Sequence, residues 1–188
     1  MSNQIPIIGV MGSGSEEWTG LSAPLGALIA GKNAHLLTGG GRGTMSAVSR
    51  SFTGTPARRG LCIGVIPGEE DDSGMFRPKA GYPNPYVELE IHSPLGPFTG
   101  EDPHQISRNH INIMTSHAIV ALPGSRGTRN ECELAQKFSK PIILYGPRAA
   151  FTDFPGDLAQ TEKLEDIASF LDNYLTQFPT EKQKAGAA

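Results

Sequence analysis

Two glycine-rich segments of this chain have the composition of loops that bind anions. The first spans residues 39–45 and reads Gly-Gly-Gly-Arg-Gly-Thr-Met, and the second spans residues 123–128 and reads Pro-Gly-Ser-Arg-Gly-Thr. Glycine lets backbone N–H groups approach an anion closely, and a helix that begins at such a loop adds the positive end of its dipole. Together with two residues after the first apolar run, these segments supply the predicted phosphate-binding residues: Gly12, Ser13, Gly39, Gly40, Gly41, Arg42, Gly43, Thr44, Met45, Pro123, Gly124, Ser125, Arg126, Gly127 and Thr128.

Other ligand signatures are missing from the sequence. Neither the GxGxxG dinucleotide fingerprint nor the P-loop pattern GxxxxGK[ST] occurs, which argues against NAD binding and NTP hydrolysis. Four histidines and both cysteines lack metal-site spacing, so no metal site is predicted, the histidines are expected to be loop or surface residues and the cysteines to be reduced. They are His92, His104, His110, His117, Cys62 and Cys132. Arg42 and Arg126 would be solvated loop charges elsewhere, but inside glycine loops a guanidinium suits phosphate.

The elements that must position these loops alternate between strands and helices. Apolar runs predict strands at 5–11, 34–37, 61–66, 86–91, 117–122 and 141–145. Helices are expected at 18–32, 44–52, 104–116, from the second glycine loop to 138, and at 164–178, with long loops at 69–84 and 93–103. This order predicts an α/β, Rossmann-like three-layer sandwich, with a mainly parallel sheet and helices on both faces.

The length and composition predict one soluble domain. All 188 residues would form a single nucleotide-binding domain with a core at about 5–178 and a disordered tail at 179–188. The net charge of −3 gives no basic footprint for nucleic acid. No apolar run reaches the roughly 20 residues that span a bilayer, and the first residues do not resemble a signal peptide. A cytoplasmic protein without membrane or nucleic-acid partners is expected.

Several motifs resemble those of one known superfamily. Residues 123–131 are similar to the PGGxGTxxE motif of the LONELY GUY phosphoribohydrolases, whose relatives are often mislabelled lysine decarboxylases. Arg108 falls where that family places the arginine paired with the motif glutamate, residues 38–45 resemble its second signature, and residues 64–67 also match. The residues at 84–87, 108–109 and 111–112 and the short first glycine loop are closer to the molybdenum-cofactor carrier branch. Ser125 departs from the family pattern by replacing the second glycine of PGG.

The resemblance implies two candidate catalytic residues, Arg108 and Glu131. In a phosphoribohydrolase, Glu131 would orient or deprotonate water and stabilise an oxocarbenium-like ribose, releasing base and ribose 5-phosphate. Arg108 would hold the ribose or phosphate and keep Glu131 ionised. No cofactor would be required for that reaction.

The alternative is a carrier or sensor that uses the same crevice without catalysis. It would hold a pterin phosphate, namely molybdenum cofactor, as its ligand. A true lysine decarboxylase is disfavoured because none of the lysines lies in a candidate loop. These residues also have a purely structural interpretation. Thr128-x-x-Glu131 has the pattern of a capping box at the start of a helix, and Arg108 would be a surface helix residue. A homodimer or homotetramer is expected for two reasons. The apolar residues Ile106, Ile111, Ile113 and Met114 are more than one core-facing side of a helix needs, and related proteins pair through the corresponding helix.

Overall fold

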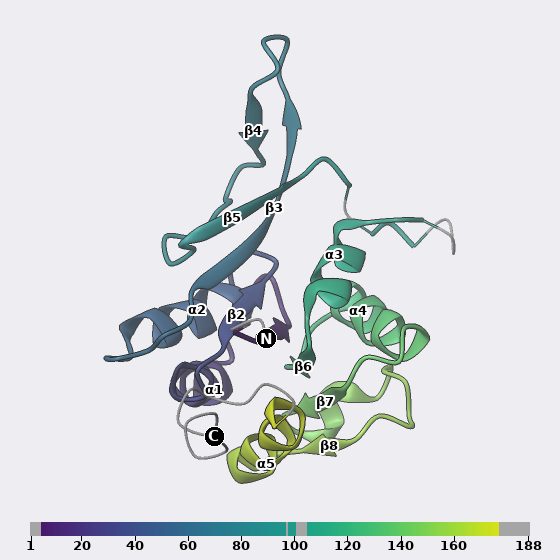
Figure 1. Cartoon of the computed structure of the whole chain (residues 1–188). Helices are drawn as coiled ribbons and strands as arrows, with labels where there is room; N and C mark the ends of the chain where they lie inside the picture. The colour runs from purple at the N-terminus through teal and green to yellow at the C-terminus, as the bar shows by residue number, and fades with distance from the viewer. Residues whose placement is uncertain (1–4, 97, 101–104, 177–188) are drawn as a thin grey trace.

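A mostly parallel sheet forms the centre of the protein (Figure 1). The computed structural model describes residues 5–96, 98–100 and 105–176. Within them, seven strands follow the order β4-β3-β2-β1-β6-β7-β8, and β5 pairs with β3 in parallel. The strands are β1 (Ile7–Met11), β2 (His35–Thr38), β3 (Cys62–Glu70), β4 (Phe76–Pro78), β5 (Leu89–Ser93), β6 (Ala118–Ala121), β7 (Ile142–Tyr145) and β8 (Gln160–Thr161).

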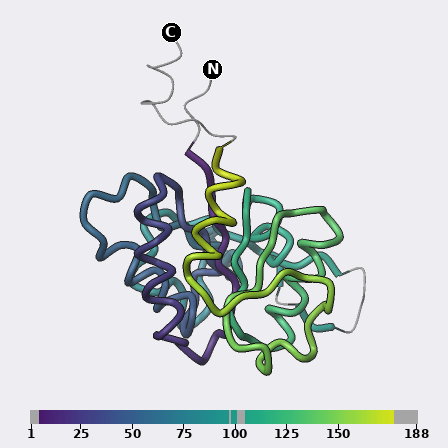
Figure 2. Tube along the Cα trace, turned by 90° about the horizontal axis from the view of Figure 1, so that it is seen from below, coloured from purple at the N-terminus to yellow at the C-terminus, as the bar shows by residue number. Residues whose placement is uncertain are grey.

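Helices cover both faces of the sheet because alternate residues of the strands point to opposite sides. Ile8 and Val10 pack in one core with α1, α2 and α5, whereas Met11 packs in the other with α3 and α4. Viewed from below, α5 lies between the two halves of the molecule (Figure 2), and it contacts α1, β6, β7 and β8. The helices are α1 (Thr19–Gly31), α2 (Thr44–Gly54), α3 (Arg108–Thr115), α4 (Arg126–Lys137) and α5 (Leu164–Leu175), with a 3-10 turn at Arg148–Phe151. The predicted three-layer Rossmann-like fold is confirmed.

The segment predicted as a loop at 69–84 contains a β-hairpin instead. Strand β3 continues to Glu70 and pairs antiparallel with β4, which makes an arm that projects from the body (Figure 1). The carboxylate of Asp71 closes the turn by accepting hydrogen bonds from Ser73 and from the N–H of Met75, and it pairs with Arg77. The hydrogen bond from Ser73, followed by that from Arg77, lowers the pKa of Asp71 to about 2. The sequence prediction missed this hairpin because its acidic turn lacks the alternation of a buried strand.

Two further boundaries differ from the predicted ones. The strand expected at 86–91 lies at Leu89–Ser93, because Asn84 accepts hydrogen bonds from the N–H groups of Tyr86 and Val87 and holds that stretch in a turn. Helix α3 begins at Arg108 rather than near 104, after Ser107 donates its N–H to Nδ1 of His110. Residue 104 and the predicted tail at 179–188 lie outside the described residues.

The helix proposed for self-association has both buried and exposed apolar residues. Ile113 is fully buried in the core of the protein, so it is unavailable for pairing. Ile106, which precedes α3, and Met114, which lies in it, are 66% and 51% exposed. Association into a dimer or tetramer stays a prediction. No helix among the described residues is both long enough and apolar enough to cross a membrane.

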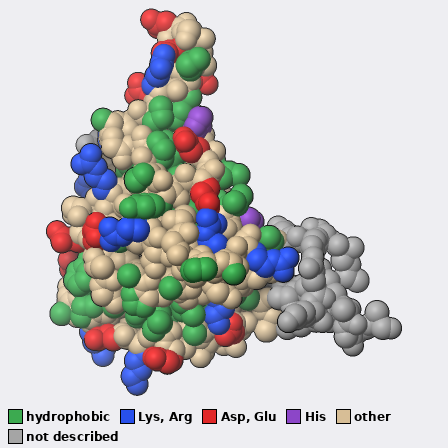
Figure 3. Space-filling model, turned by 90° about the vertical axis from the view of Figure 1, so that its left-hand side faces the viewer, with side chains coloured by type: hydrophobic (Ala, Val, Ile, Leu, Met, Phe, Trp, Pro, Cys, Tyr) green, Lys and Arg blue, Asp and Glu red, His purple; other side chains and the backbone are tan. Residues whose placement is uncertain are grey.

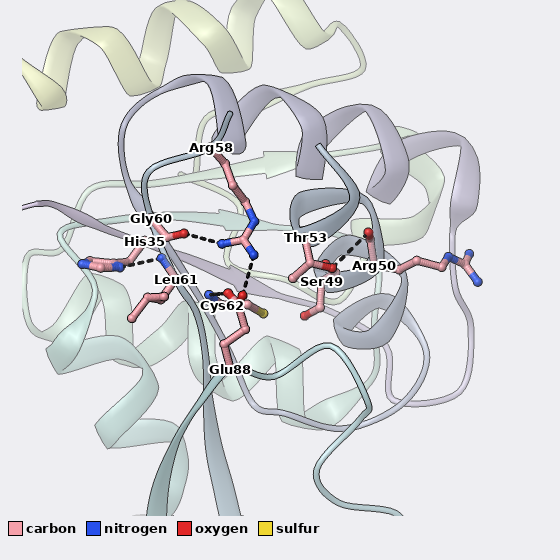
Figure 4. A network of polar contacts seen from close by, with 9 residues as sticks. All are labelled: His35, Ser49, Arg50, Thr53, Arg58, Gly60, Leu61, Cys62 and Glu88. Carbon is pink, nitrogen blue, oxygen red and sulfur yellow. Dashed lines mark hydrogen bonds and ion pairs between the residues drawn. The ribbon is translucent and has the colours of Figure 1, made fainter. Parts of the chain in front are cut away.

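A polar cluster ties together the amino ends of β2 and β3 (Figure 4). The guanidinium of Arg58 donates to the carbonyl of Gly60 and pairs with Glu88, whose second carboxylate oxygen accepts the N–H of Cys62. The ring of His35 accepts the N–H of Leu61. Burial raises the pKa of the Cys62 thiol to about 11, so this cysteine is an inert part of the scaffold. The cluster lies at the opposite ends of the strands from the glycine loops.

Removing Arg58 is expected to destabilise the fold. Arg58→Ala should lower the free energy of unfolding by about 1–2 kcal/mol, because it leaves the Gly60 carbonyl and the Glu88 carboxylate without their donor. Urea denaturation measures the change. Arg50→Ala is the matched control, since its ion pair with Glu17 is exposed and worth less than about 0.5 kcal/mol. Equal losses in the two variants would contradict the structural role of the cluster.

Candidate functional site

A cavity of about 160 Å³ lies at the carboxyl ends of the central strands. The loops that follow β1, β2 and β6 meet there, as expected at this edge of a doubly wound sheet. It is lined by Val10, Met11, Gly12, Gly14, Gly39, Met45, Tyr82, Arg108, Asn109, Ser125, Gly127, Thr128 and Glu131. Eight of the predicted site residues therefore come together: Gly12, Gly39, Met45, Arg108, Ser125, Gly127, Thr128 and Glu131.

The loop after β1 holds the two other glycine loops in place. Ser13 donates its N–H to the carbonyl of Pro123, and its own carbonyl accepts the N–H of Thr44. The hydroxyl of Ser13 accepts the N–H groups of Ser15 and Glu16. Ser13 and Thr44 thus lie at the predicted site, but their backbone N–H groups are already bonded within the protein. Their position favours a role in fixing the loops rather than in direct anion binding.

Glycine is required where these loops approach one another. A Cβ on Gly124 would collide with the Thr128 side chain and would lie 3.1 Å from the backbone of Gly12. Gly43 has a φ of +62°, and a Cβ there would lie 2.5 Å from the carbonyl oxygen of Ser13. The glycines at these two positions therefore allow the loops to pack closely and to shape the cavity.

Arg108 joins three separate segments beneath the first glycine loop. Its Nη1 donates to the carbonyls of Gly39 and Val65 at 2.6 and 3.0 Å, and its Nη2 donates to the hydroxyl of Tyr82 at 3.2 Å. The guanidinium also lies 5.2 Å from the centre of the Tyr82 ring. The interpretation of Arg108 as a surface helix residue is therefore wrong. It forms no ion pair with Glu131, and its donors hold the backbone around the cavity.

Glu131 lies in the cavity wall and is 8% exposed. The capping-box interpretation is wrong, because α4 begins at Arg126 after the N-cap Ser125 and Glu131 instead accepts a hydrogen bond of 2.9 Å from Asn112. Burial raises the pKa of Glu131 to about 7, although the Asn112 hydrogen bond and the charge of Arg108 both lower it. The expectation that Arg108 keeps Glu131 ionised therefore needs correction: near neutral pH the desolvation of the carboxyl group outweighs that charge.

The start of α4 offers the free donors of the site. The N–H groups of residues 126–128 have no acceptor within their own helix, no side chain caps them, and no acidic residue lies in the first turn. Arg42 lies beside Gly81 and Arg126 beside Gly100, and neither arginine forms an ion pair with another described residue. The free N–H groups at the start of α4, with an arginine in each glycine loop, make the cavity suitable for a phosphate.

Several residues of the site were not predicted from the sequence. Tyr82 comes from the long segment 69–84, Asn109 donates to Asn130 at 3.0 Å beside the cavity, and Asn112 holds Glu131. Both asparagines belong to the motifs that carry the family resemblance, which was the signal for them. Of the other predicted residues, Gly40, Gly41 and Gly43 shape the first loop, and Pro123 and Gly124 lie on an adjoining groove. The described residues hold no cluster of three or more metal-ligating side chains.

Solved structures of similar shape include two proteins named for molybdenum cofactor. The carrier protein from Chlamydomonas reinhardtii is 27% identical with a TM-score of 0.66, and 92% of this chain matches 99% of that one. The molybdenum cofactor binding protein from Rippkaea orientalis is 26% identical with a TM-score of 0.69, over 92% of this chain and 98% of that one. Among curated proteins, an uncharacterized protein from Archaeoglobus fulgidus is 29% identical over 150 residues, which cover 75% of this chain and 85% of that protein.

The motifs and the matched structures agree with a family model that spans most of the chain. That model, described as the SLOG cluster4 family, matches residues 5–171, which include the cavity and all three of its loops. The resemblance to the LONELY GUY-like superfamily, with details of the molybdenum-cofactor carrier branch, is confirmed. The chain belongs to the SLOG cluster4 family.

Proposed function

We propose that this protein binds a phosphorylated pterin, molybdenum cofactor, and carries it without chemical turnover. The observation that carries this proposal is the engagement of Arg108. Its guanidinium is bonded to two backbone carbonyls and a tyrosine hydroxyl, so it is committed to holding the cavity rather than free to act on a ribose. The similarity over nearly the whole chain to two proteins named for this cofactor supports the same ligand.

The placement of charge supports a phosphate at one end of this ligand. The free N–H groups at the start of α4 adjoin the cavity, whose lining includes Ser125, Gly127 and Thr128, and each glycine loop carries an arginine, Arg42 or Arg126, that forms no ion pair with the described residues. The inner cavity of about 160 Å³ is smaller than the roughly 300 Å³ at which ligand pockets usually begin. The ligand would therefore extend into the adjoining groove of about 500 Å³, with which the cavity shares Gly14 and Ser125.

Glu131 favours a second candidate function, the hydrolysis of a nucleoside 5′-monophosphate. A carboxyl group with a pKa of about 7 in a cavity wall can exchange a proton at neutral pH, which is what a general acid or base must do. In this reading Glu131 would activate the water that attacks the N-glycosidic bond. Its lack of an ion pair with Arg108 weighs against the reaction, because the family pattern couples these two residues.

Two measurements on the purified full chain separate carrier from enzyme. Protein produced in molybdate-supplemented cells is expected to retain molybdenum and pterin in comparable amounts, measured by mass spectrometry of the metal and by fluorescence of the oxidised pterin. Arg126→Ala should lose at least about 80% of both, since roughly 1–2 kcal/mol of charge-assisted contact is removed. Arg50→Ala, which removes an exposed arginine that lines neither the cavity nor the groove, is the control and should retain both.

A panel of nucleoside monophosphates tests the second function. We expect no release of base from any of them by the wild-type protein. Base release that disappears in Glu131→Gln, together with the absence of bound pterin and molybdenum, would replace the carrier proposal by the hydrolase. Glu133→Gln, which changes an exposed carboxylate on the same helix, is the matched control and should leave any base release unchanged.

A further inference from the structure

The groove beside the cavity has an aromatic residue in its wall. Its lining residues are Ser13, Gly14, Ser15, Glu16, Trp18, Pro123, Gly124, Ser125 and Ala150. Trp18 is the only tryptophan of the sequence, and its side chain makes no ring contact or cation contact with another described residue. It is 37% exposed, so a large apolar ring is left beside an open groove. Figure 3 shows one face of the molecule, on which apolar groups lie among charged side chains, so an exposed apolar group by itself needs no explanation.

The backbone at Trp18 has a conformation that disfavours this residue type. Its φ and ψ are both 46°, in the left-handed region that glycine and asparagine tolerate but bulky residues rarely adopt. The carbonyl of Trp18 is fixed there by the N–H groups of Leu21 and Ser22 and by the Ser22 hydroxyl. It also occupies the N-cap position of α1, for which tryptophan is a poor residue. The local backbone therefore gives no reason for a tryptophan at this position. Residues that are unfavourable for their local conformation occur most often at functional sites.

A carboxylate without a partner accompanies this ring. Glu16 lines the groove, and its side chain forms no hydrogen bond or ion pair with the described residues. The adjacent Glu17 differs, because its carboxylate pairs with Arg50 and accepts the hydroxyl of Thr19. The hydroxyl of Ser13 accepts the N–H of Glu16, and the hydroxyl of Thr44 donates to the Glu16 carbonyl, so the backbone that carries the free carboxylate is fixed. A carboxylate can accept hydrogen bonds from the adjacent N–H groups on the edge of a planar heterocycle.

We infer that Trp18 and Glu16 form the ring-binding subsite of the ligand, with Trp18 stacking on a planar heterocycle and Glu16 accepting its N–H groups. The inference rests on the proposed function and specifies how the ligand's ring is recognised. The cavity and the groove share the lining residues Gly14 and Ser125, and Ser125 is the N-cap of α4. These shared residues determine which end of the ligand lies in the groove. A phosphate at the start of α4 leaves the ring of the same molecule in the groove. A ring of the 2-amino-4-oxo type, as in pterins, carries the adjacent N–H donors that a carboxylate selects.

Calorimetry with three probes tests this subsite on the full chain: neopterin monophosphate, adenosine 5′-monophosphate and ribose 5-phosphate. The first has the ring and the N–H edge, the second has a ring without that edge, and the third has no ring. We expect neopterin monophosphate to bind the wild-type protein at least tenfold more tightly than the others, and to change the fluorescence of Trp18. A tenfold difference from ribose 5-phosphate matches the contribution of one stacked ring, and a tenfold difference from adenosine 5′-monophosphate matches that of a hydrogen bond to a charged group.

Matched variants separate the subsite from the fold. Trp18→Asn should weaken neopterin monophosphate about tenfold without lowering the melting temperature, because asparagine tolerates the left-handed backbone. Glu16→Gln should weaken the same probe about tenfold, while Glu17→Gln should leave it unchanged. None of these variants should alter the affinity for ribose 5-phosphate.

Two results would overturn the inference in different ways. If neopterin monophosphate binds wild type and Trp18→Asn equally well, the subsite is wrong while phosphate binding at the cavity stands. If no probe binds the wild-type protein at all, the proposed function fails and the subsite fails with it.

Discussion

Glu131→Gln is expected to make the protein more stable at pH 9 by on the order of 3 kcal/mol and to leave its stability almost unchanged at pH 4. Burial raises the pKa of Glu131 from 4.5 to about 7. A carboxyl group whose pKa is higher in the folded state stabilises the fold below its unfolded pKa and loses that contribution as the pH rises through the folded value. Glutamine keeps the neutral form at every pH and can still accept the hydrogen bond of Asn112.

The measurement is the free energy of unfolding from denaturant titrations at pH 4, 6, 7 and 9. The difference between the variant and the wild type isolates Glu131, because His35 and His117, whose pKa values burial lowers, titrate in both proteins. Glu133→Gln on the same helix is the control, since that side chain is exposed and pairs with Arg129. It should shift stability by less than about 0.5 kcal/mol at any pH. A difference for Glu131→Gln that does not grow with pH would show that the carboxyl group is not desolvated.

Arg108→Ala is expected to lower the free energy of unfolding by about 3–5 kcal/mol. The substitution leaves the buried carbonyls of Gly39 and Val65 without a donor and removes the contact with Tyr82. A donor lost from a buried carbonyl costs roughly 1–3 kcal/mol. The same change should enlarge and loosen the cavity, so that the retained pterin and molybdenum fall below detection.

Urea denaturation and analysis of the retained ligand measure both effects of this change. Arg42→Ala is its control, because that side chain is exposed and forms no hydrogen bond or ion pair with the described residues. It should weaken ligand retention while leaving the stability within about 0.5 kcal/mol of the wild type. If Arg108→Ala unfolds no more easily than Arg42→Ala, Arg108 does not hold the loops and its role as a ligand contact must be reconsidered.

The sequence alone determined the fold class and the position of the loops that line the cavity. Apolar runs such as 117–122, followed directly by glycine-rich turns, are local patterns, and local patterns of this kind order strands and helices along a chain. Because parallel strands bring their carboxyl ends to one edge, the convergence of residues 12, 39 and 125 follows from that order. The projecting hairpin at 68–78 was missed, because a three-residue strand beside an acidic turn carries little periodic signal.

The roles of the candidate catalytic residues were decided by the tertiary structure. Thr128-x-x-Glu131 has the spacing of a capping box, and what excludes that role is the contact with Asn112, 19 residues earlier in the chain. Arg108 reaches the carbonyl of Gly39 across 69 residues. Burial of Glu131, which raises its pKa to about 7, comes from several elements packed together. Such contacts depend on how distant segments fold against one another, so a linear pattern could place the residues near the site but could not assign their partners, their exposure or their charge.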